Sequence, residues 1–304
     1  MKKSKIIFIG SSNIINHHIV AAKQNGFELH GICTTRKNNS KALRLSKDYK
    51  IKKIYKNVDI ALKDAANQKN ISFVIASRIK DNVKIIKKCL SINSRIKILT
   101  EKPISFNHNE IKDLIKYNNR IFVGYNRIYY KSVKFLKSKL RNKKKLNIIV
   151  KCPEKNKKNI FTNSCHIFSI LYNCFGELKL IYRIKNNSFI NCIFNDRKGN
   201  IFYMSFYFNV SDNFSIQVYD NVSNYLLKPI EKLTLFEGIN KKNVNMQTQY
   251  VPKKKKTIEE KFSKKPGFYE QYINFNKFLN NEHHTRFSVR DSCKLIKIVS
   301  EICK

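Results

Sequence analysis

Short apolar segments alternate with helical ones over the first 124 residues, and this alternation constrains the fold more than any other feature. The apolar segments are rich in β-branched and aromatic residues, and each is followed by a stretch with helical spacing. Strands alternating with helices of this length predict a doubly wound parallel sheet. Because crossovers between parallel strands are right-handed, the carboxyl ends of the strands should meet at one edge. We expect strands at 5–9, 27–33, 71–76, 95–100 and 120–124, and helices at 13–25, 41–49, 59–67, 82–90 and 107–118.

The pattern changes after Gly124, where successive strands separated by turn residues replace the alternation. This predicts an open antiparallel sheet flanked by helices, and two domains, 1–122 and 123–304. Residues 239–265 are polar and lysine-rich, so we expect a loop over the site there. The later strands are expected at 146–151, 179–185, 188–194, 200–209, 214–219, 223–228 and 232–236. The later helices are expected at 132–140, 164–175, 268–279 and 289–303.

The formal net charge of +40 raises the question of a nucleic-acid partner. The lysines are spread along the whole chain beside many asparagines and isoleucines, as an A- and T-rich coding sequence produces. No helix-turn-helix, RNP motif or zinc finger is recognisable, so we expect non-specific attraction of anions and no dedicated nucleic-acid site. No segment approaches the ~20 apolar residues that span a bilayer. Eight cysteines without a Cys-x-x-Cys pair indicate no metal site, and with no export signal they indicate the cytosol.

The first strand-to-helix turn, Gly10 to Ile15, is a candidate dinucleotide site. The fingerprint Gly-x-Gly-x-x-Gly places a pyrophosphate on the helix N-terminus. Gly10 keeps the tight turn. Ser12 stands where the second glycine lets the backbone approach the phosphates, and Ile15 replaces the third. A turn that binds no nucleotide is the alternative.

The second strand ends at Thr34-Thr35-Arg36-Lys37, which bears on the choice between NAD and NADP. Proteins specific for NAD usually carry an acid here to bind the ribose 2′-hydroxyl. Thr34 takes that place, and the cations Arg36 and Lys37 stand where a 2′-phosphate would lie. The sequence therefore favours NADP, although a basic pair in so basic a protein can also be without meaning.

The apolar run 98–100 ends in Glu101-Lys102-Pro103. Ligands bind outside the carboxyl ends of strands in open α/β sheets, so an ammonium here is well placed for catalysis. A chance tripeptide is the alternative. With Val123 to Arg127, and with His166 in an apolar helix, the tripeptide resembles the Gfo/Idh/MocA family of NAD(P)-dependent sugar and cyclitol oxidoreductases, whose signature is Glu-Lys-Pro.

This resemblance implies a Rossmann half, a helix-flanked antiparallel sheet and NADP or NAD as cofactor. It implies a small carbohydrate-type substrate, oxidised or reduced at a secondary alcohol, as in surface polysaccharide biosynthesis. Lys102 and His166 would be catalytic. The cofactor would be bound by Gly10, Ser12, Asn13, Ile14, Thr34, Thr35, Arg36, Ser77 and Glu101. The substrate would be bound by Lys102, Tyr125, Arg127, Thr162 and His166.

Several positions depart from the family pattern. His18 falls where the family often has a histidine, but Asn82 replaces another histidine. Thr162 and Ser169 stand where the helix of His166 typically carries two aspartates. A histidine without a carboxylate partner is a weaker, less well oriented proton acceptor. A catalytically degenerate member that binds a ligand or regulates is therefore the alternative function, and a capping or core role is the alternative for His166.

Two further expectations concern assembly. Strand 200–209 carries aromatic residues on both faces, so neither face is cleanly polar. We expect a dimer or tetramer built on the exposed face of the antiparallel sheet. We also expect Lys102 and His166 to point into one cleft between the two domains.

Overall fold

The computed structural model describes residues 4–34, 40–245, 247–260, 265–282 and 287–304. The chain divides into two compact units. The first unit contains Met1–Asn126 and Gly267–Ser300, and the second contains Arg127–Pro266 and Glu301–Lys304. In the part of the chain that is described, no helix is both long and apolar enough to cross a lipid bilayer.

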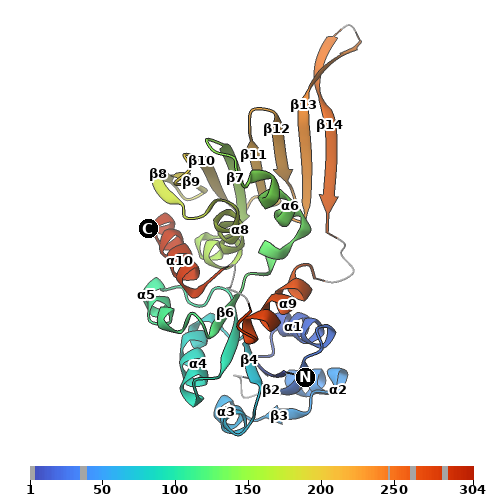
Figure 1. The fold of residues 1–304 in the computed structure, drawn as a ribbon. Coiled ribbons are helices and arrows are strands. Elements are labelled where there is room, and N and C mark those ends of the chain that lie inside the picture. The colour runs from blue at the N-terminus through green and yellow to red at the C-terminus, as the bar shows by residue number, and fades with distance from the viewer. Residues whose placement is uncertain (1–3, 35–39, 246, 261–264, 283–286) are drawn as a thin grey trace. The chain divides into compact units, whose positions relative to one another are not determined.

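The first unit is built on a six-stranded parallel sheet (Figure 1), which confirms the predicted fold class. The strand order is β3-β2-β1-β4-β5-β6, so the order reverses between β1 and β4. In sheets of this kind ligands bind at the carboxyl ends beside such a reversal. The strands are β1 (Lys5–Ile9), β2 (Glu28–Cys33), β3 (Lys53–Tyr55), β4 (Ile71–Ile75), β5 (Lys97–Glu101) and β6 (Ile121–Gly124).

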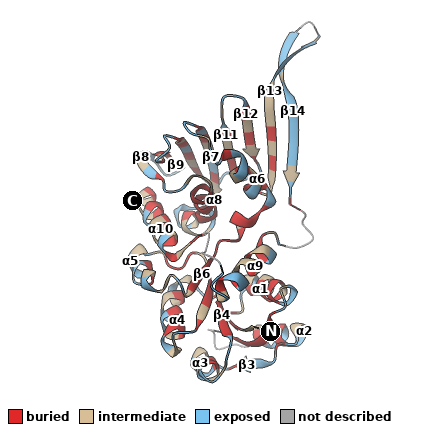
Figure 2. Ribbon diagram, viewed as in Figure 1, coloured by how far each residue is buried: buried red, intermediate tan, exposed pale blue. Residues whose placement is uncertain are grey.

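Helices α1 (Asn13–Gln24), α2 (Ser40–Tyr49), α3 (Val58–Ala66), α4 (Ile79–Ile92) and α5 (His108–Lys112) connect these strands. Strands β1 and β4 are buried almost throughout, as expected of central parallel strands covered on both faces (Figure 2). Strand β3 was not expected from the sequence, because it has only three residues. Its last residue, Tyr55, donates a hydrogen bond to Asp64, which also binds the side chains of His30 and Lys53.

Helix α9 (Phe268–Leu279) belongs to the first unit, although it lies far along the chain. Its aromatic side chains pack against residues of the parallel sheet and its loops. The ring centroids of Tyr272 and Phe27 are 5.8 Å apart, and those of Phe275 and Phe122 are 5.7 Å apart. The sequence pattern had placed everything after residue 122 in the second domain, because contacts at this separation leave no trace in local spacing. Helix α10 (Val289–Cys303) follows α9.

The second unit contains an eight-stranded sheet with the order β14-β13-β12-β11-β7-β10-β9-β8. The pairing of β7 with β10 is parallel, and the other neighbouring pairs are antiparallel. The strands are β7 (Asn147–Glu154), β8 (Lys179–Lys185), β9 (Phe189–Asn195), β10 (Ile201–Phe208), β11 (Ser215–Tyr219), β12 (Ser223–Leu227), β13 (Lys232–Val244) and β14 (Gln247–Glu259). The helices of this unit include α6 (Lys131–Leu140), the short α7 (Lys157–Asn159) and α8 (Cys165–Phe175). Phe168 of α8 packs against Phe194 and Phe206, so α8 covers one face of the sheet.

The expected loop at 239–265 was wrong, because most of it is a long hairpin. Strands β13 and β14 pair from Lys232 with Glu259 to Val244 with Gln247. Strand β12 pairs only with residues 233–237 of β13, so the outer part of the hairpin is a two-stranded ribbon (Figure 1). Both faces of this ribbon are exposed, and its strands therefore lack the alternation of apolar and polar residues that marks a half-buried strand.

Candidate dinucleotide and catalytic site

The turn after β1 leaves the N-terminus of α1 open. Ser12 occupies the N-cap position, but within the described part of the chain no side chain caps the first turn, which also has no acidic residue. Gly10 has a φ of +119°, and a Cβ there would lie 2.3 Å from the carbonyl oxygen of Ala76. The turn therefore packs closely on the end of β4, with backbone N–H groups of α1 available to an anion. This arrangement fits the pyrophosphate of a dinucleotide.

A cation from the next helix reaches the same place. Lys41 Nζ on α2 donates a hydrogen bond of 2.6 Å to Oδ1 of Asn13, the first residue of α1. A positive charge beside an uncapped helix N-terminus adds to its attraction for phosphate. The sequence interpretation missed Lys41, since only the fold brings α2 to the start of α1.

The carboxyl ends of β2 and β4 border a cavity of about 400 Å³, on the adenosine side of a dinucleotide in this fold. Thr34 is buried and lines it, whereas Thr35, Arg36 and Lys37 lie outside the described residues. The lining contains four basic residues, Lys56, Arg78, Lys84 and Lys88. Arg78 pairs with Asp81 at 2.8 Å, and Lys88 pairs with Asp59 at 2.6 Å. Cations thus exceed acids around this cavity.

The tripeptide Glu101-Lys102-Pro103 stands at the carboxyl end of β5, where the sequence placed it. The peptide bond between Lys102 and Pro103 is cis. Asn82, which is buried at the position of the family's histidine, joins this segment to the end of β4. The Ser77 hydroxyl donates to Asn82 Oδ1 at 2.6 Å, and Asn82 Nδ2 donates to the Pro103 carbonyl oxygen at 3.4 Å. Asn82 therefore bridges Ser77 and Pro103, two contacts that the sequence interpretation missed.

Tyr125 lies in the core of the first unit. It is fully buried, its hydroxyl lies 3.2 Å from Ser292 Oγ, and its ring centroid lies 4.2 Å from that of Phe287. These contacts are internal to the unit. A role of Tyr125 in substrate binding stays a prediction of the sequence.

In the second unit, the hydroxyls that replace the two expected aspartates bind backbone carbonyls. Ser169 Oγ donates to the His166 carbonyl oxygen at 2.7 Å, and Thr162 Oγ1 donates to the Asn159 carbonyl oxygen at 3.3 Å. His166 is buried near the start of α8. A one-turn π-helical segment, Ile160–Ser164, leads into this helix, and such segments are frequent at functional sites.

A carboxylate that the sequence interpretation missed holds this segment. Glu154, buried at the end of β7, accepts hydrogen bonds at Oε1 from the Ser164 backbone N–H at 2.9 Å and from Ser164 Oγ at 2.5 Å. Its Oε2 accepts from Asn163 Nδ2 at 3.1 Å. Burial raises the pKa of Glu154, against the opposing effect of these hydrogen bonds and of the Arg127 charge. An acid with a raised pKa, hydrogen-bonded to the two residues that directly precede the helix of a candidate catalytic histidine, is typical of functional sites.

The two candidate catalytic residues belong to different units. Lys102 lies in the first unit and His166 in the second. Their meeting in one cleft therefore stays a prediction.

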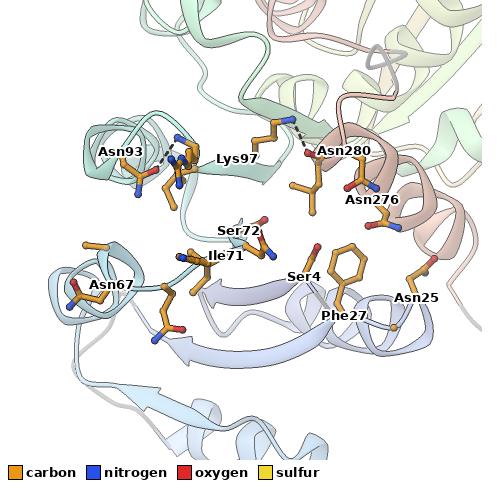
Figure 3. Close-up of a pocket in the computed structure, with 18 residues that line it drawn as sticks. Ser4, Asn25, Phe27, Asn67, Ile71, Ser72, Asn93, Lys97, Asn276 and Asn280 are labelled. Carbon is orange, nitrogen blue, oxygen red and sulfur yellow. Dashed lines mark hydrogen bonds between the residues drawn. The ribbon is translucent and has the colours of Figure 1, made fainter. Parts of the chain in front are cut away.

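A second cavity, of about 820 Å³, opens at the opposite edge of the parallel sheet (Figure 3). Four residues that follow helices line it: Asn25, Asn67, Asn93 and Asn280. Helix C-termini carry a partial negative charge, which disfavours phosphate groups. The Lys97 ammonium partly neutralises this charge at the end of α9, because its Nζ donates to the carbonyl oxygens of Phe278 and Leu279 at 2.6 and 3.0 Å. This cavity is therefore not the dinucleotide site.

Comparisons with known proteins agree with this geometry. Residues 4–125 match the model of the oxidoreductase family with an NAD-binding Rossmann fold, Gfo/Idh/MocA. No curated protein matches the sequence. Solved structures match the fold over almost the whole chain.

Three such structures illustrate the range. Myo-inositol dehydrogenase from Lactobacillus casei, in complex with NAD(H) and myo-inositol, is 14% identical with a TM-score of 0.70, covering 98% of this chain and 93% of that one. UDP-N-acetylglucosamine 3-dehydrogenase from Acidithiobacillus ferrooxidans is 10% identical with a TM-score of 0.76, covering 99% and 97%. An oxidoreductase from Desulfitobacterium hafniense, described as NADPH-dependent, is 12% identical with a TM-score of 0.77, covering 100% and 95%.

At such low identities these likenesses concern the fold alone. The family match of the N-terminal region, together with the Glu-Lys-Pro tripeptide and the open turn, confirms the resemblance seen in the sequence and a nicotinamide dinucleotide as the family's cofactor. Residues 4–125 are therefore similar to the NAD-binding Rossmann domain of the Gfo/Idh/MocA oxidoreductase family, and they make up most of the first unit.

Proposed function

We propose that this protein is an NAD(P)-dependent dehydrogenase or reductase acting on a secondary alcohol of a sugar, cyclitol or nucleotide-linked sugar. The observation that carries the proposal is the position of Lys102. It follows β5, two strands from the open turn after β1, on the edge where the strand order reverses. The names of the inositol and UDP-sugar dehydrogenases that share the fold support the substrate class.

The dinucleotide, when bound, supplies or accepts the hydride. Gly10, Ser12 and Asn13 would hold its pyrophosphate with the first backbone N–H groups of α1. The Lys102 ammonium would donate a hydrogen bond to the reacting oxygen and stabilise the negative charge that develops there. His166 would accept or donate the hydroxyl proton as general base or acid.

NADP is the favoured cofactor in this proposal. Thr34 cannot supply the acid that binds a ribose 2′-hydroxyl, and the cavity beside it is lined by Lys56 and Lys84, which add to the cations expected from Arg36 and Lys37. Positive charge at this place favours a 2′-phosphate. NADPH should therefore bind more tightly than NADH, and Arg36→Ala should reduce the difference.

A degenerate, ligand-binding member of the family is the competing function. The hydrogen bonds of Ser169 and Thr162 favour it, because neither hydroxyl replaces the carboxylate that would raise the basicity of His166. Such a protein would bind a dinucleotide or a sugar without turning it over.

Fluorescence titration with NADPH and NADH, followed by a turnover screen with cyclitols and nucleotide-linked sugars, separates these functions. If the protein is an enzyme, Lys102→Ala should abolish turnover and leave NADPH affinity nearly unchanged. His166→Ala should slow turnover by about 10²–10⁴-fold, the usual contribution of a positioned acid or base. Tight NADPH binding without turnover of any substrate would favour the degenerate member, and binding of neither dinucleotide would refute the proposal.

We propose further that the protein forms a homo-oligomer through the outer face of the second unit's sheet. A row of apolar side chains crosses this face on neighbouring strands, interrupted by Gln217. Tyr203, in its middle, is 44% exposed, and Tyr182 at its end is 56% exposed. Exposed apolar rows of this kind are typical of protein interfaces. We call this set the apolar row; it consists of Tyr182, Ile193, Tyr203, Ile149 and Leu226. A cytosolic location, supported by eight cysteines that form no disulfide, remains part of the proposal.

A further inference from the structure

A buried chain of hydrogen bonds ends on the Glu-Lys-Pro tripeptide. His18 Nε2 on α1 lies 2.9 Å from Oε1 of Glu101, and His18 Nδ1 lies 3.1 Å from the hydroxyl of Tyr272 on α9. Both His18 and Tyr272 are completely buried. Three elements that are distant in the sequence thus meet within the first unit, on the first residue of the tripeptide.

The chemistry of the three groups decides which of them donates each hydrogen bond. An ionised carboxylate only accepts hydrogen bonds, so the proton of a neutral His18 ring lies on Nε2. Nδ1 then accepts, and the Tyr272 hydroxyl donates to it. Burial raises the pKa of Tyr272 well above its usual value, and the Glu101 charge adds to this effect, so the hydroxyl stays protonated.

The environment is unusual for a site that serves stability alone. Gln271, next to Tyr272, is fully buried, and neither of its amide atoms has a hydrogen-bond partner among the residues described. A Cβ on Gly124 would lie 3.0 Å from Glu101 Oε1 and 3.5 Å from Gln271 Nε2, so the glycine leaves room for both groups. Burying unpaired polar atoms destabilises a protein, because their hydrogen bonds to water are lost and not replaced. Proteins usually retain such costs at functional sites.

Only one oxygen of Glu101 is occupied by this chain. Within the described ranges Oε2 makes no hydrogen bond, and the side chain is 13% exposed at the carboxyl end of β5. The second oxygen can therefore accept a hydrogen bond from a ligand at the edge where the family binds its dinucleotide.

We propose that His18 and Tyr272 are positioning residues, which fix Glu101 so that its second carboxylate oxygen accepts a hydrogen bond from the nicotinamide half of the cofactor. This inference rests on the proposed function. The donor on the cofactor is a ribose hydroxyl or the carboxamide N–H, which share the chemistry that a carboxylate recognises. His18 selects the rotamer of Glu101, and Tyr272 selects the tautomer and ring orientation of His18, as residues behind a binding group commonly do.

The adenosine half of the cofactor supplies a matched control ligand. The test measures the affinity of each variant for NADPH and for 2′,5′-ADP, which lacks the nicotinamide half. His18→Asn places an amide near Nδ1 and removes the group that binds Glu101, so NADPH affinity should fall on the order of tenfold. Its affinity for 2′,5′-ADP should not change. A general loss of structure would weaken both ligands equally, and that result would overturn the inference.

Conservative and double variants complete the test. His18→Gln places an amide near Nε2 and should restore most of the NADPH affinity. Tyr272→Phe removes one hydroxyl, preserves the ring, and should weaken NADPH by about two- to fivefold. In a Glu101→Gln background His18→Asn should have no further effect, because His18 acts through the carboxylate. Equal NADPH affinities of the wild type and His18→Asn would refute the positioning role, whereas failure of the wild type to bind any dinucleotide would refute the proposed function instead.

Discussion

The substitution Gly10→Ala should be among the most costly single changes in the first unit. Gly10 has a φ of +119°, and imposing such a conformation on an L-residue costs about 1–2 kcal/mol. The new Cβ would also lie 2.3 Å from the carbonyl oxygen of Ala76 and 2.8 Å from its carbonyl carbon. Because these are backbone atoms at the end of a buried strand, they cannot rotate away, and overpacking adds about 1–3 kcal/mol. We expect a total loss of about 2–5 kcal/mol in the free energy of unfolding.

Gly26→Ala is the matched control. Gly26 has a φ of +77°, but a Cβ there meets no heavy atom within 4 Å, so only the backbone cost of about 1–2 kcal/mol applies. Urea unfolding of both variants and the wild type, without cofactor and at one pH, gives the difference from the midpoints and slopes. Equal losses for the two variants would show that the contact with Ala76 relaxes freely, and would refute the reasoning. Equal losses would also mean that the turn does not pack tightly on β4, and this packing would no longer support the dinucleotide site.

Three further predictions concern charge and assembly. Burial alone would raise the pKa of Asp64, but three hydrogen bonds hold this pKa well below its usual range. The ionised Asp64 therefore stabilises the fold above about pH 4, and this stabilisation is lost as the pH falls below that value. In urea unfolding, Asp64→Asn should weaken the dependence of the unfolding free energy on acid pH. Glu154→Ala leaves three donors of the segment before α8 without an acceptor and should cost about 2–4 kcal/mol, whereas Glu154→Gln, which keeps an acceptor, should cost less than half as much; similar losses would contradict this account. Tyr203→Lys in the middle of the apolar row should shift the protein toward monomer in light scattering, and a wild type that is already monomeric at micromolar concentration would contradict the proposed interface.

The parallel sheet could be predicted from the sequence because its signals are local. Each buried strand is a continuous apolar run, and each helix has its own spacing, so β1, β4 and β5 were expected within one or two residues of their observed bounds. The hairpin of β13 and β14 could not be predicted in the same way. The outer part of this hairpin is exposed on both faces, so its residues do not alternate between apolar and polar. The run of lysines in β14 therefore gives no strand signal in the sequence.

The candidate site could be predicted only in part. The position of Lys102 followed from the strand that precedes it, since a strand and its end are adjacent in the sequence. The partners of these groups lie elsewhere in the chain. His18 and Glu101 are separated by 83 residues, and Lys41 and Asn13 by 28, so no local pattern relates them. Glu154 likewise stands outside the helix in which the missing aspartates were sought.

The return of α9 to the first unit has a consequence for protein synthesis. When the ribosome has completed Asn126, all six strands of the parallel sheet have been made, but the aromatic residues of α9 that cover Phe27 and Phe122 have not. The ribosome must first make Arg127–Pro266, which takes about 7–30 s at about 5–20 residues per second. Throughout that interval the first unit lacks the helix that covers Phe27 and Phe122, so its apolar surface stays exposed. A nascent chain of this protein therefore completes the long segment of its second unit, Arg127–Pro266, before it completes the first unit.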